Sequence, residues 1–281
     1  MQNGQPSLTA LGAAIQRAAH QTLDDANIFK DAFARILLGR EADALIAAVS
    51  ADPAHQQMRI FMAARSRFAE DCLEAAVSRG VRQVVILGAG LDTFALRNPH
   101  ATLGLRVFEV DHPATQAWKR ERLAEAGLTT PESLTFAPVD FERQSLAEGL
   151  IAAGFQATEP AFFLWLGVVP YLQREAISSI FQFIASTPKS EVVFDYSEPL
   201  ENYSAERQTN VIAMAARTAA IGEPWLTYFD PSALSTELRE RGFQELEDLG
   251  LADIAVRYLG TGEGDVTSVA GPHVICARRT D

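Results

Sequence analysis

A glycine-rich run directly after a short apolar stretch is the strongest candidate for a ligand site in this sequence. Residues 84–87 are apolar, and the next five residues are Gly88, Ala89, Gly90, Leu91 and Asp92. In an open α/β sheet, ligands bind beyond the carboxyl ends of the strands, and glycines in the first turn let a ligand approach the backbone. A dinucleotide fingerprint has a third glycine where this chain has Thr93, and Asp92 would repel a pyrophosphate. The run therefore predicts a ligand-binding turn and weighs against NAD.

Acidic residues also mark the ends of the next two apolar stretches. Asp111 follows the stretch 105–110, roughly 20 residues after the glycines, and an acid at that spacing can accept hydrogen bonds from ribose hydroxyls. Glu109 is the alternative for the same role. Asp140 and Phe141 follow the stretch 134–137, where they could accept from an adenine amino group and pack on its ring.

Three acids at successive strand ends, with no lysine among them, favour a cationic cofactor without phosphate. S-adenosylmethionine has a sulfonium, an ammonium, a ribose and an adenine. Its one anion is a carboxylate, for which an arginine is the natural bidentate partner. Arg65 or Arg67, on the helical stretch before the first strand, could supply that partner. Each acid alone could equally be a helix cap, and the glycines alone could form only a tight turn.

Candidates for the chemical step follow from the reaction that such a cofactor performs. Methyl transfer from a sulfonium is a direct displacement, so the main requirement is alignment of the nucleophile. A carboxylate or acidic enol needs no general base, whereas an alcohol or phenol benefits from one. His112, Asp195 and Tyr196 are candidates near strand ends, and Tyr171 and Tyr203 could shape an acceptor pocket. Each has an ordinary structural alternative, so no catalytic residue is assigned.

The elements that must position these residues are short apolar stretches that alternate with helical patterns. Predicted strands lie at 84–87, 105–110, 134–137, 162–166, 192–196, 244–249 and 273–277, and predicted helices near 113–126, 143–153, 173–187 and 231–241. Gly242 would end the last helix, and 259–271 reads as a glycine-rich loop. Such alternation is typical of a parallel sheet covered on both faces. We therefore expect residues 81–281 to form one α/β domain with a doubly wound, Rossmann-like sheet of about seven strands.

Two segments fall outside that alternation. Residues 1–80 show helical patterns only, including stretches at 9–29 and 53–79, and predict a helical N-terminal cap. The segment at about 200–230 is irregular and rich in aromatic residues, which predicts an insertion that acts as a lid.

Composition excludes several other classes of function. The 281 residues include 24 basic and 36 acidic side chains, and this net charge of -12 argues against a nucleic-acid partner. Cys72 and Cys276 show no disulfide or redox spacing, and the five histidines show no metal-binding spacing, so no metal is expected. No apolar stretch approaches about 18 residues, and the N-terminus lacks a signal pattern. We therefore expect a cytoplasmic protein without membrane segments.

Four motifs, in their order and spacing, resemble the leucine carboxyl methyltransferase family. They are VVILGAGLDTFALR, FEVDHP, PVDFE and FLWLGVVPYL. The resemblance implies a class I methyltransferase that uses S-adenosylmethionine, and bacterial members are usually described as small-molecule O-methyltransferases. It also implies that Arg65 holds the cofactor carboxylate, Gly88 lies under the amino-acid part, and Asp111 binds the ribose. Asp140 and Phe141 would bind the adenine, and the N-terminal helices would help to cover the cofactor.

One position departs from the family pattern. Members that methylate a protein C-terminus carry a glutamate where this chain has Leu166. The departure weakens the case for a protein substrate and favours a small, hydrophobic metabolite, for example of the polyketide type, methylated on a carboxylate or hydroxyl. The alternatives are a protein that binds S-adenosylmethionine without catalysis and an NAD-type oxidoreductase.

Overall fold

A seven-stranded sheet forms the centre of the molecule. The computed structural model describes the chain apart from residues 1–6, 51–52, 141–143 and 263–268. The strand order is β3-β2-β1-β4-β5-β7-β6. Among the described strands, β7 alone runs in the direction opposite to all the others. The strands are β1 Gln83–Leu87, β2 Arg106–Asp111, β3 Leu134–Pro138, β4 Phe162–Trp165, β5 Glu191–Ser197, β6 Glu245–Leu249 and β7 Pro272–Arg278.

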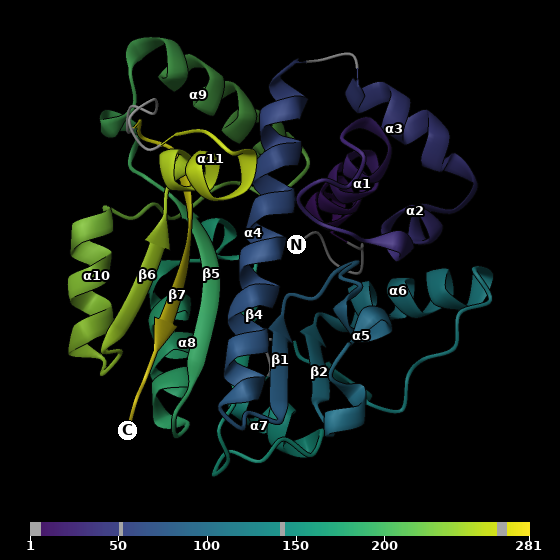
Figure 1. Cartoon of the computed structure of the whole chain (residues 1–281), viewed down its shortest axis with the longest axis vertical. Coiled ribbons are helices and arrows are strands. Elements are labelled where there is room, and N and C mark those ends of the chain that lie inside the picture. The colour runs from purple at the N-terminus through teal and green to yellow at the C-terminus, as the bar shows by residue number, and fades with distance from the viewer. Residues whose placement is uncertain (1–6, 51–52, 141–143, 263–268) are drawn as a thin grey trace.

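Helices cover both faces of this sheet (Figure 1). The α-helices are α1 Leu8–Leu23, α2 Ala32–Leu38, α3 Ala42–Ser50, α4 Pro53–Ser78, α5 Phe94–Arg97, α6 Pro113–Glu125, α7 Leu146–Ala152, α8 Arg174–Ser186, α9 Ala205–Ala220, α10 Pro231–Glu240 and α11 Leu251–Leu259. One apolar cluster joins the sheet to α7, α8 and α10, and a second joins the opposite face to α4, α5 and α11. The predicted doubly wound, Rossmann-like fold is therefore confirmed.

The central strands are mostly apolar because both of their faces are covered. Every residue of β1, β4 and β5 is buried. Helix α8 shows the matching helical pattern, since Ile177, Ile180, Phe181 and Ile184 recur at the spacing of one helix face and are all buried. Phe181 meets Trp165 of β4 edge to face, with ring centroids 5.5 Å apart. The pattern in the sequence thus determines which face of α8 packs on the sheet.

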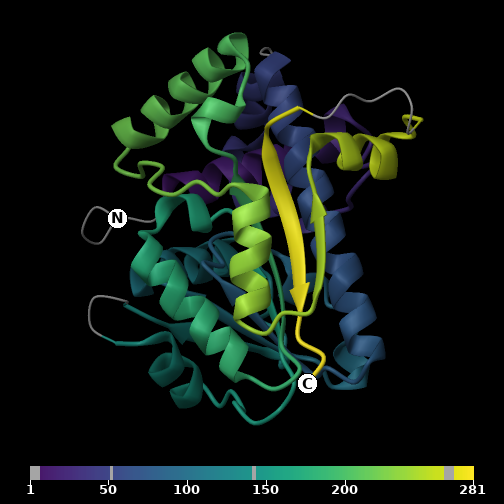
Figure 2. The same cartoon turned by 90° about the vertical axis from the view of Figure 1, so that its left-hand side faces the viewer.

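The N-terminal helices divide into two parts. Helix α4 packs along the sheet, whereas α1, α2 and α3 share a separate apolar cluster next to the carboxyl ends of the strands. The predicted helix at 9–29 ends earlier, at Leu23, because Asp25 and Ala26 adopt positive φ angles of 51° and 50°. These three helices close one end of the molecule, beside α9 (Figure 2).

Two helices differ from the sequence-based expectation. The segment 200–230 was predicted to be irregular, yet residues Ala205–Ala220 form the 16-residue helix α9. This stretch contains neither glycine nor proline and is rich in alanine, so its helix propensity is high. The aromatic residues that suggested an irregular segment lie on either side of it. Helix α11 was not predicted, because a short apolar run next to a strand does not by itself distinguish helix from strand.

A buried ion pair links β2 to α6. Lys119 Nζ donates to Glu109 Oε2 over 2.6 Å, and the two side chains are 2% and 1% exposed. Burial raises the pKa of the Glu109 carboxyl to about 7, although the lysine opposes this shift. The charges are therefore tolerated here only as a pair.

We predict that Lys119→Met lowers the free energy of unfolding by about 3–5 kcal/mol, because it leaves Glu109 buried without its counterion. The loss should be smaller at pH 5 than at pH 8, since a carboxyl with a raised folded-state pKa is protonated, and neutral, at the lower pH. Urea unfolding at both pH values measures this. The matched control is Glu109→Leu/Lys119→Met, and a double variant no more stable than the single one would contradict the prediction.

Candidate active site

One large cavity opens at the carboxyl ends of the parallel strands. Its volume is about 2470 Å³, and its lining comes from α1, α4, α9 and the loops that follow β1, β2, β4 and β5. The chain leaves β1 for β2 on one side and later returns to β4 on the other, so the cavity lies where the strand order reverses. Pockets for one small ligand are roughly 300–1,000 Å³. The cavity therefore has room for two molecules.

The two glycines after β1 are required by close packing. Gly88 has a φ of +64°, and a Cβ there would lie 2.4 Å from Val168 Cγ2. Gly90 has a φ of +47°, and a Cβ there would lie 2.8 Å from the Cβ of Ala10 in α1. The turn therefore contacts both the loop after β4 and the N-terminal helix, and Gly88, Ala89 and Gly90 all line the cavity.

Asp111 ends β2 with its carboxylate held by the same turn. Its Oδ2 accepts the N–H of Gly90 over 2.6 Å, and its Oδ1 accepts the N–H of His112 over 2.7 Å. Burial raises the pKa of the Asp111 carboxyl, and the two N–H donors oppose that shift. Each oxygen keeps a second lone pair, so the group can still accept hydrogen bonds from a ligand in the cavity.

The structure separates the other predicted acids. Asp140 and Asp92 line the cavity, but Asp92 Oδ1 also accepts the N–H of Phe94 over 2.7 Å and so caps the turn that begins α5. Glu109 is buried beside Lys119 and does not line the cavity. We therefore leave Glu109 out of the candidate site. Phe141 lies outside the described residues.

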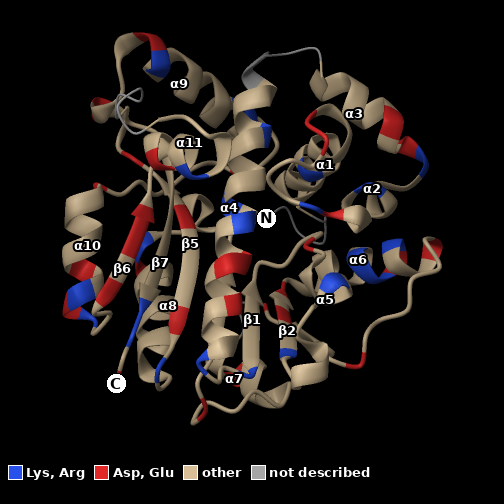
Figure 3. Cartoon of the chain, viewed as in Figure 1, with Lys and Arg blue, Asp and Glu red and all other residues tan. Residues whose placement is uncertain are grey.

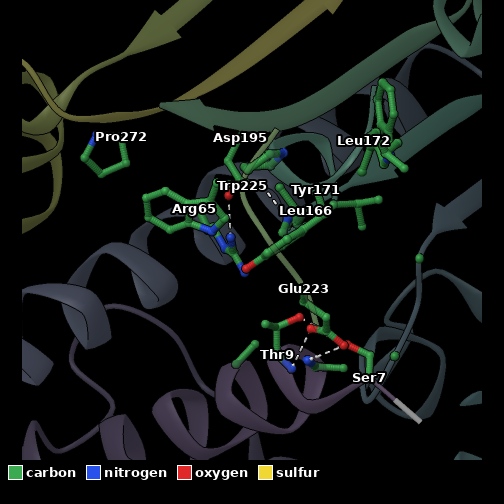
Figure 4. A pocket seen from close by; sticks show the side chains of 18 of the residues that line it. Ser7, Thr9, Arg65, Leu166, Tyr171, Leu172, Asp195, Glu223, Trp225 and Pro272 are labelled. Atoms are coloured by element: carbon green, nitrogen blue, oxygen red, sulfur yellow. Dashed lines mark hydrogen bonds and ion pairs between the residues drawn. The ribbon is translucent and has the colours of Figure 1, made fainter. Parts of the chain in front are cut away.

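An arginine and an aspartate face the cavity together. Arg65 Nη1 donates to Asp195 Oδ2, and Asp195 Oδ1 accepts the N–H of Gly167 over 2.5 Å (Figure 4). Arg65 Nε is buried with no hydrogen-bond partner among the described residues, so the guanidinium keeps one donor that the protein does not use. Arg67, the other sequence candidate, is half exposed, pairs with Asp71 over 2.7 Å and does not line the cavity.

The remaining catalytic candidates differ in position. His112 lines the cavity, but its Nδ1 accepts the N–H of Ala114 over 3.2 Å as the N-cap of α6. Tyr196 does not line the cavity. Its hydroxyl donates to Asp248 over 2.6 Å, and its ring stacks on His273 with centroids 5.0 Å apart. Tyr196 therefore belongs to a buried network between β5, β6 and β7.

Part of the cavity lining is aromatic and apolar. Leu166, Tyr171, Tyr203 and Trp225 all line it, and burial raises the pKa of the Tyr171 hydroxyl. Leu166 follows β4 and adds an apolar surface to the cavity.

Sequence reasoning missed a contact that closes the cavity. Glu223, in the loop after α9, accepts from Thr9 N over 3.0 Å, Leu8 N over 3.2 Å and Ser7 Oγ over 3.3 Å (Figure 4). A carboxylate is favourable at a helix N-terminus, where the N–H groups are unpaired. Ser7 before an apolar helical pattern is a recognisable cap signal, but no local pattern connects Glu223 with residues more than 200 positions earlier.

Other kinds of site find no support in the described part of the chain. No group of three or more histidine, cysteine or acidic side chains there could hold a metal ion. Among the described helices, none combines the length and apolar character needed to cross a bilayer.

Two solved structures share this fold over nearly the whole chain. A Thermobifida fusca structure named for methyl transfer matches with a TM-score of 0.57 and 16% identity, and covers 99% of this chain and 97% of its own. Magnesium protoporphyrin IX methyltransferase from Synechocystis, with S-adenosylhomocysteine bound, matches with a TM-score of 0.50 and 12% identity over 95% of this chain and 99% of its own. At such identities the likeness shows the fold alone.

Sequence relatives identify the family. The family model for leucine carboxyl methyltransferase matches residues 10–185. YktD of Bacillus subtilis, named for S-adenosyl-L-methionine-dependent methyl transfer, is 32% identical with 99% of both chains covered. A Mycobacterium avium protein with the same kind of name is 32% identical over 89% of this chain and 87% of its own. The chain belongs to the leucine carboxyl methyltransferase family and is an S-adenosylmethionine-dependent methyltransferase. The predicted cofactor and family are confirmed, and the NAD-type oxidoreductase alternative is set aside.

We predict that Glu223→Ala weakens the closure of α1 over the cavity. Loss of a helix cap lowers the free energy of unfolding by about 0.5–2 kcal/mol, and S-adenosylhomocysteine should dissociate faster from the more open cavity. Thermal unfolding and stopped-flow dissociation measure the two effects. Glu201→Ala, an exposed glutamate at the start of the same segment, is the matched control, and equal behaviour of the two variants would show that the cap does not close the cavity.

Proposed function

We propose that this methyltransferase transfers the methyl group to an acidic oxygen of a small, hydrophobic metabolite. The observation that carries the proposal is the single cavity, because its lining includes both the turn after β1 and the aromatic side chains of Tyr171, Tyr203 and Trp225. Leu166 supports a small molecule over a protein C-terminus, because the family's glutamate is absent at that position.

The residues around the turn fit the cofactor. When bound, S-adenosylmethionine supplies an electrophilic methyl group on a good leaving group. Arg65 would hold its carboxylate through the unpartnered Nε side, and the turn at Gly88, Ala89 and Gly90 would lie under its amino-acid part. Asp111 would accept from the ribose hydroxyls, and Asp140 from the adenine amino group.

The carboxylate alternative is favoured over the hydroxyl because no candidate base is free to act. Asp195 forms an ion pair with Arg65, and taking up a proton would remove that ion pair. His112 accepts at Nδ1, so its neutral tautomer carries the proton on Nε2 and that nitrogen donates. Tyr196 lies outside the cavity. A carboxylate or acidic enol arrives deprotonated, so the protein has only to align it and exclude water.

A product analysis tests the acceptor chemistry. The enzyme is incubated with methyl-labelled S-adenosylmethionine and two panels of hydrophobic compounds, carboxylic acids and the corresponding alcohols or phenols. We expect label in the acids, released as volatile methanol by mild base, because methyl esters hydrolyse and methyl ethers do not. Label found only as base-stable ether would contradict the proposal for an acidic oxygen.

We predict that Asp111→Ala weakens binding of S-adenosylhomocysteine by about 1–3 kcal/mol, the usual effect of losing matched hydrogen bonds in a buried site. Calorimetric titration measures this, with Asp43→Ala as the control because Asp43 is exposed and outside the cavity. Asp111→Asn keeps an acceptor for the Gly90 N–H and should also bind more weakly. Unchanged affinity in both folded variants would remove Asp111 from the ribose site.

We predict that Arg65→Ala weakens the binding of S-adenosylhomocysteine by a similar amount. The binding of adenosine should be weakened much less, because adenosine has no carboxylate. Arg67→Ala, two residues away on the same helix but outside the cavity, is the control and should change neither affinity. Parallel titrations with both ligands distinguish the cases. Equal losses for the two ligands would mean that Arg65 does not contact the carboxylate.

A further inference from the structure

The arginines around the cavity fall into two kinds. Those that line it are Arg17, Arg65, Arg207 and Arg217. The first two are neutralised by the buried carboxylates of Asp31 and Asp195. The second two, both on α9, make no hydrogen bond or ion pair with any described residue. Positive charge without a partner therefore faces the cavity from the side of α9.

The inner face of α9 is exposed to the cavity rather than packed on protein. Arg207, Val211, Met214 and Thr218 recur at helical spacing, and all four line the cavity and are half-buried. No residue of α9 is fully buried. Figures 1 and 2 place this helix at the end of the molecule toward which β1 points. A ligand that fills the cavity would cover this face of α9. Such a ligand would need an anionic group for the arginine and an apolar surface for the side chains next to it.

No acidic residue of the described chain forms an ion pair with either of these arginines. The buried carboxylate of Glu198 lies beside Gly271, as Arg207 does, but it is bound to the Gly271 N–H, Asn202 and His273. Of the acidic residues that line the cavity, only Glu206 has no partner, and it is exposed. Asp92, Asp111 and Glu223 accept from backbone N–H groups, and Asp195 pairs with Arg65. Lysines and arginines are otherwise scattered over many elements (Figure 3), in a chain whose net charge is -12. A general attraction for anions is therefore absent, and the positive charge under α9 is local.

We propose that the methyl acceptor carries an anionic group remote from the methylated oxygen, and that Arg207 binds this group, with Arg217 at the rim of the cavity. The proposal rests on the proposed methyl transfer and specifies its substrate as an amphipathic oxyanion. Its apolar body would contact Val211 and Met214, and its charged end would be paired by the guanidinium of Arg207.

The position of Arg207 separates it from the Arg65–Asp195 pair, where the proposed function places the cofactor carboxylate. Its Nη2 lies 3.7 Å from where a Cβ of Gly271 would lie, directly before β7, and Pro272 pairs with Ser197. Asp195, the partner of Arg65, lies two residues earlier on β5, which is about 7 Å along a strand. A guanidinium on the attacking oxygen would also stabilise the charge that the transition state loses, and so would slow the reaction. Arg207 is therefore an anchor for the acceptor.

Two fluorescent probes with the same apolar body test the anchor. 8-Anilinonaphthalene-1-sulfonate is an oxyanion, and N-phenyl-1-naphthylamine is its uncharged counterpart. We expect Arg207→Gln to lower the affinity for the sulfonate about tenfold, as loss of one charge-assisted hydrogen bond implies. The affinity for the neutral probe should change less than twofold. Arg207→Lys keeps the charge and should recover part of the affinity for the sulfonate.

Matched controls complete the test. Arg239→Gln removes an exposed arginine of α10 that lies outside the cavity, and it should change the affinity for neither probe. The same affinity for S-adenosylhomocysteine in each variant would show that the cofactor end is intact. Equal losses for both probes in Arg207→Gln, or no loss beyond that of Arg239→Gln, would overturn the anchor. Failure of the wild-type enzyme to bind S-adenosylhomocysteine would instead count against the proposed cofactor site, so the two failures are distinguishable.

Discussion

The packing of one short turn is the constraint on which the rest of the site depends. Gly88 lies against Val168 from the loop after β4, and Gly90 lies against Ala10 of α1. The N–H of Gly90 also holds the carboxylate of Asp111 at the end of β2. Because neither glycine has room for a Cβ, three segments that are distant in the sequence can close on the same turn. Protein interiors are packed too densely for these contacts to form partially, so the turn, α1 and the loop after β4 take up their positions together.

The charged groups that line the cavity differ between its two sides. On the side of the strands, acidic groups are held by backbone N–H donors and by Arg65, an arrangement that fits a cofactor with positive charges and one carboxylate. On the side of α9, two arginines have no protein partner. Electrostatic interactions are stronger in a site from which water is excluded. The same cavity can therefore bind a cationic donor at one end and an anionic acceptor at the other.

Closure of the cavity depends on a contact between the two parts of the chain that cover it. Glu223 binds the first turn of α1, while α9, which precedes it, has no fully buried residue. Segments with few buried contacts open at low free energy, and binding sites use such segments because ligands must enter and leave. The carboxylate of Glu223, at the N-terminus of α1, thus joins the segment after α9 to the helix that packs on the glycine turn.

The sequence by itself determined the sheet, most helices, the family, the cofactor and the glycine turn, because each rests on local periodicity or on motifs that are continuous along the chain. From the residues alone Arg65 and Arg67 were alternatives, and the structure separates them because only Arg65 lines the cavity. Only the tertiary structure showed that Glu109 is paired with Lys119 and that Asp195 is paired with Arg65. It alone brought Glu223 to α1 and left Arg207 over the cavity without a partner. The physical reason is that partners and burial depend on contacts between residues far apart in the chain, which no local pattern encodes.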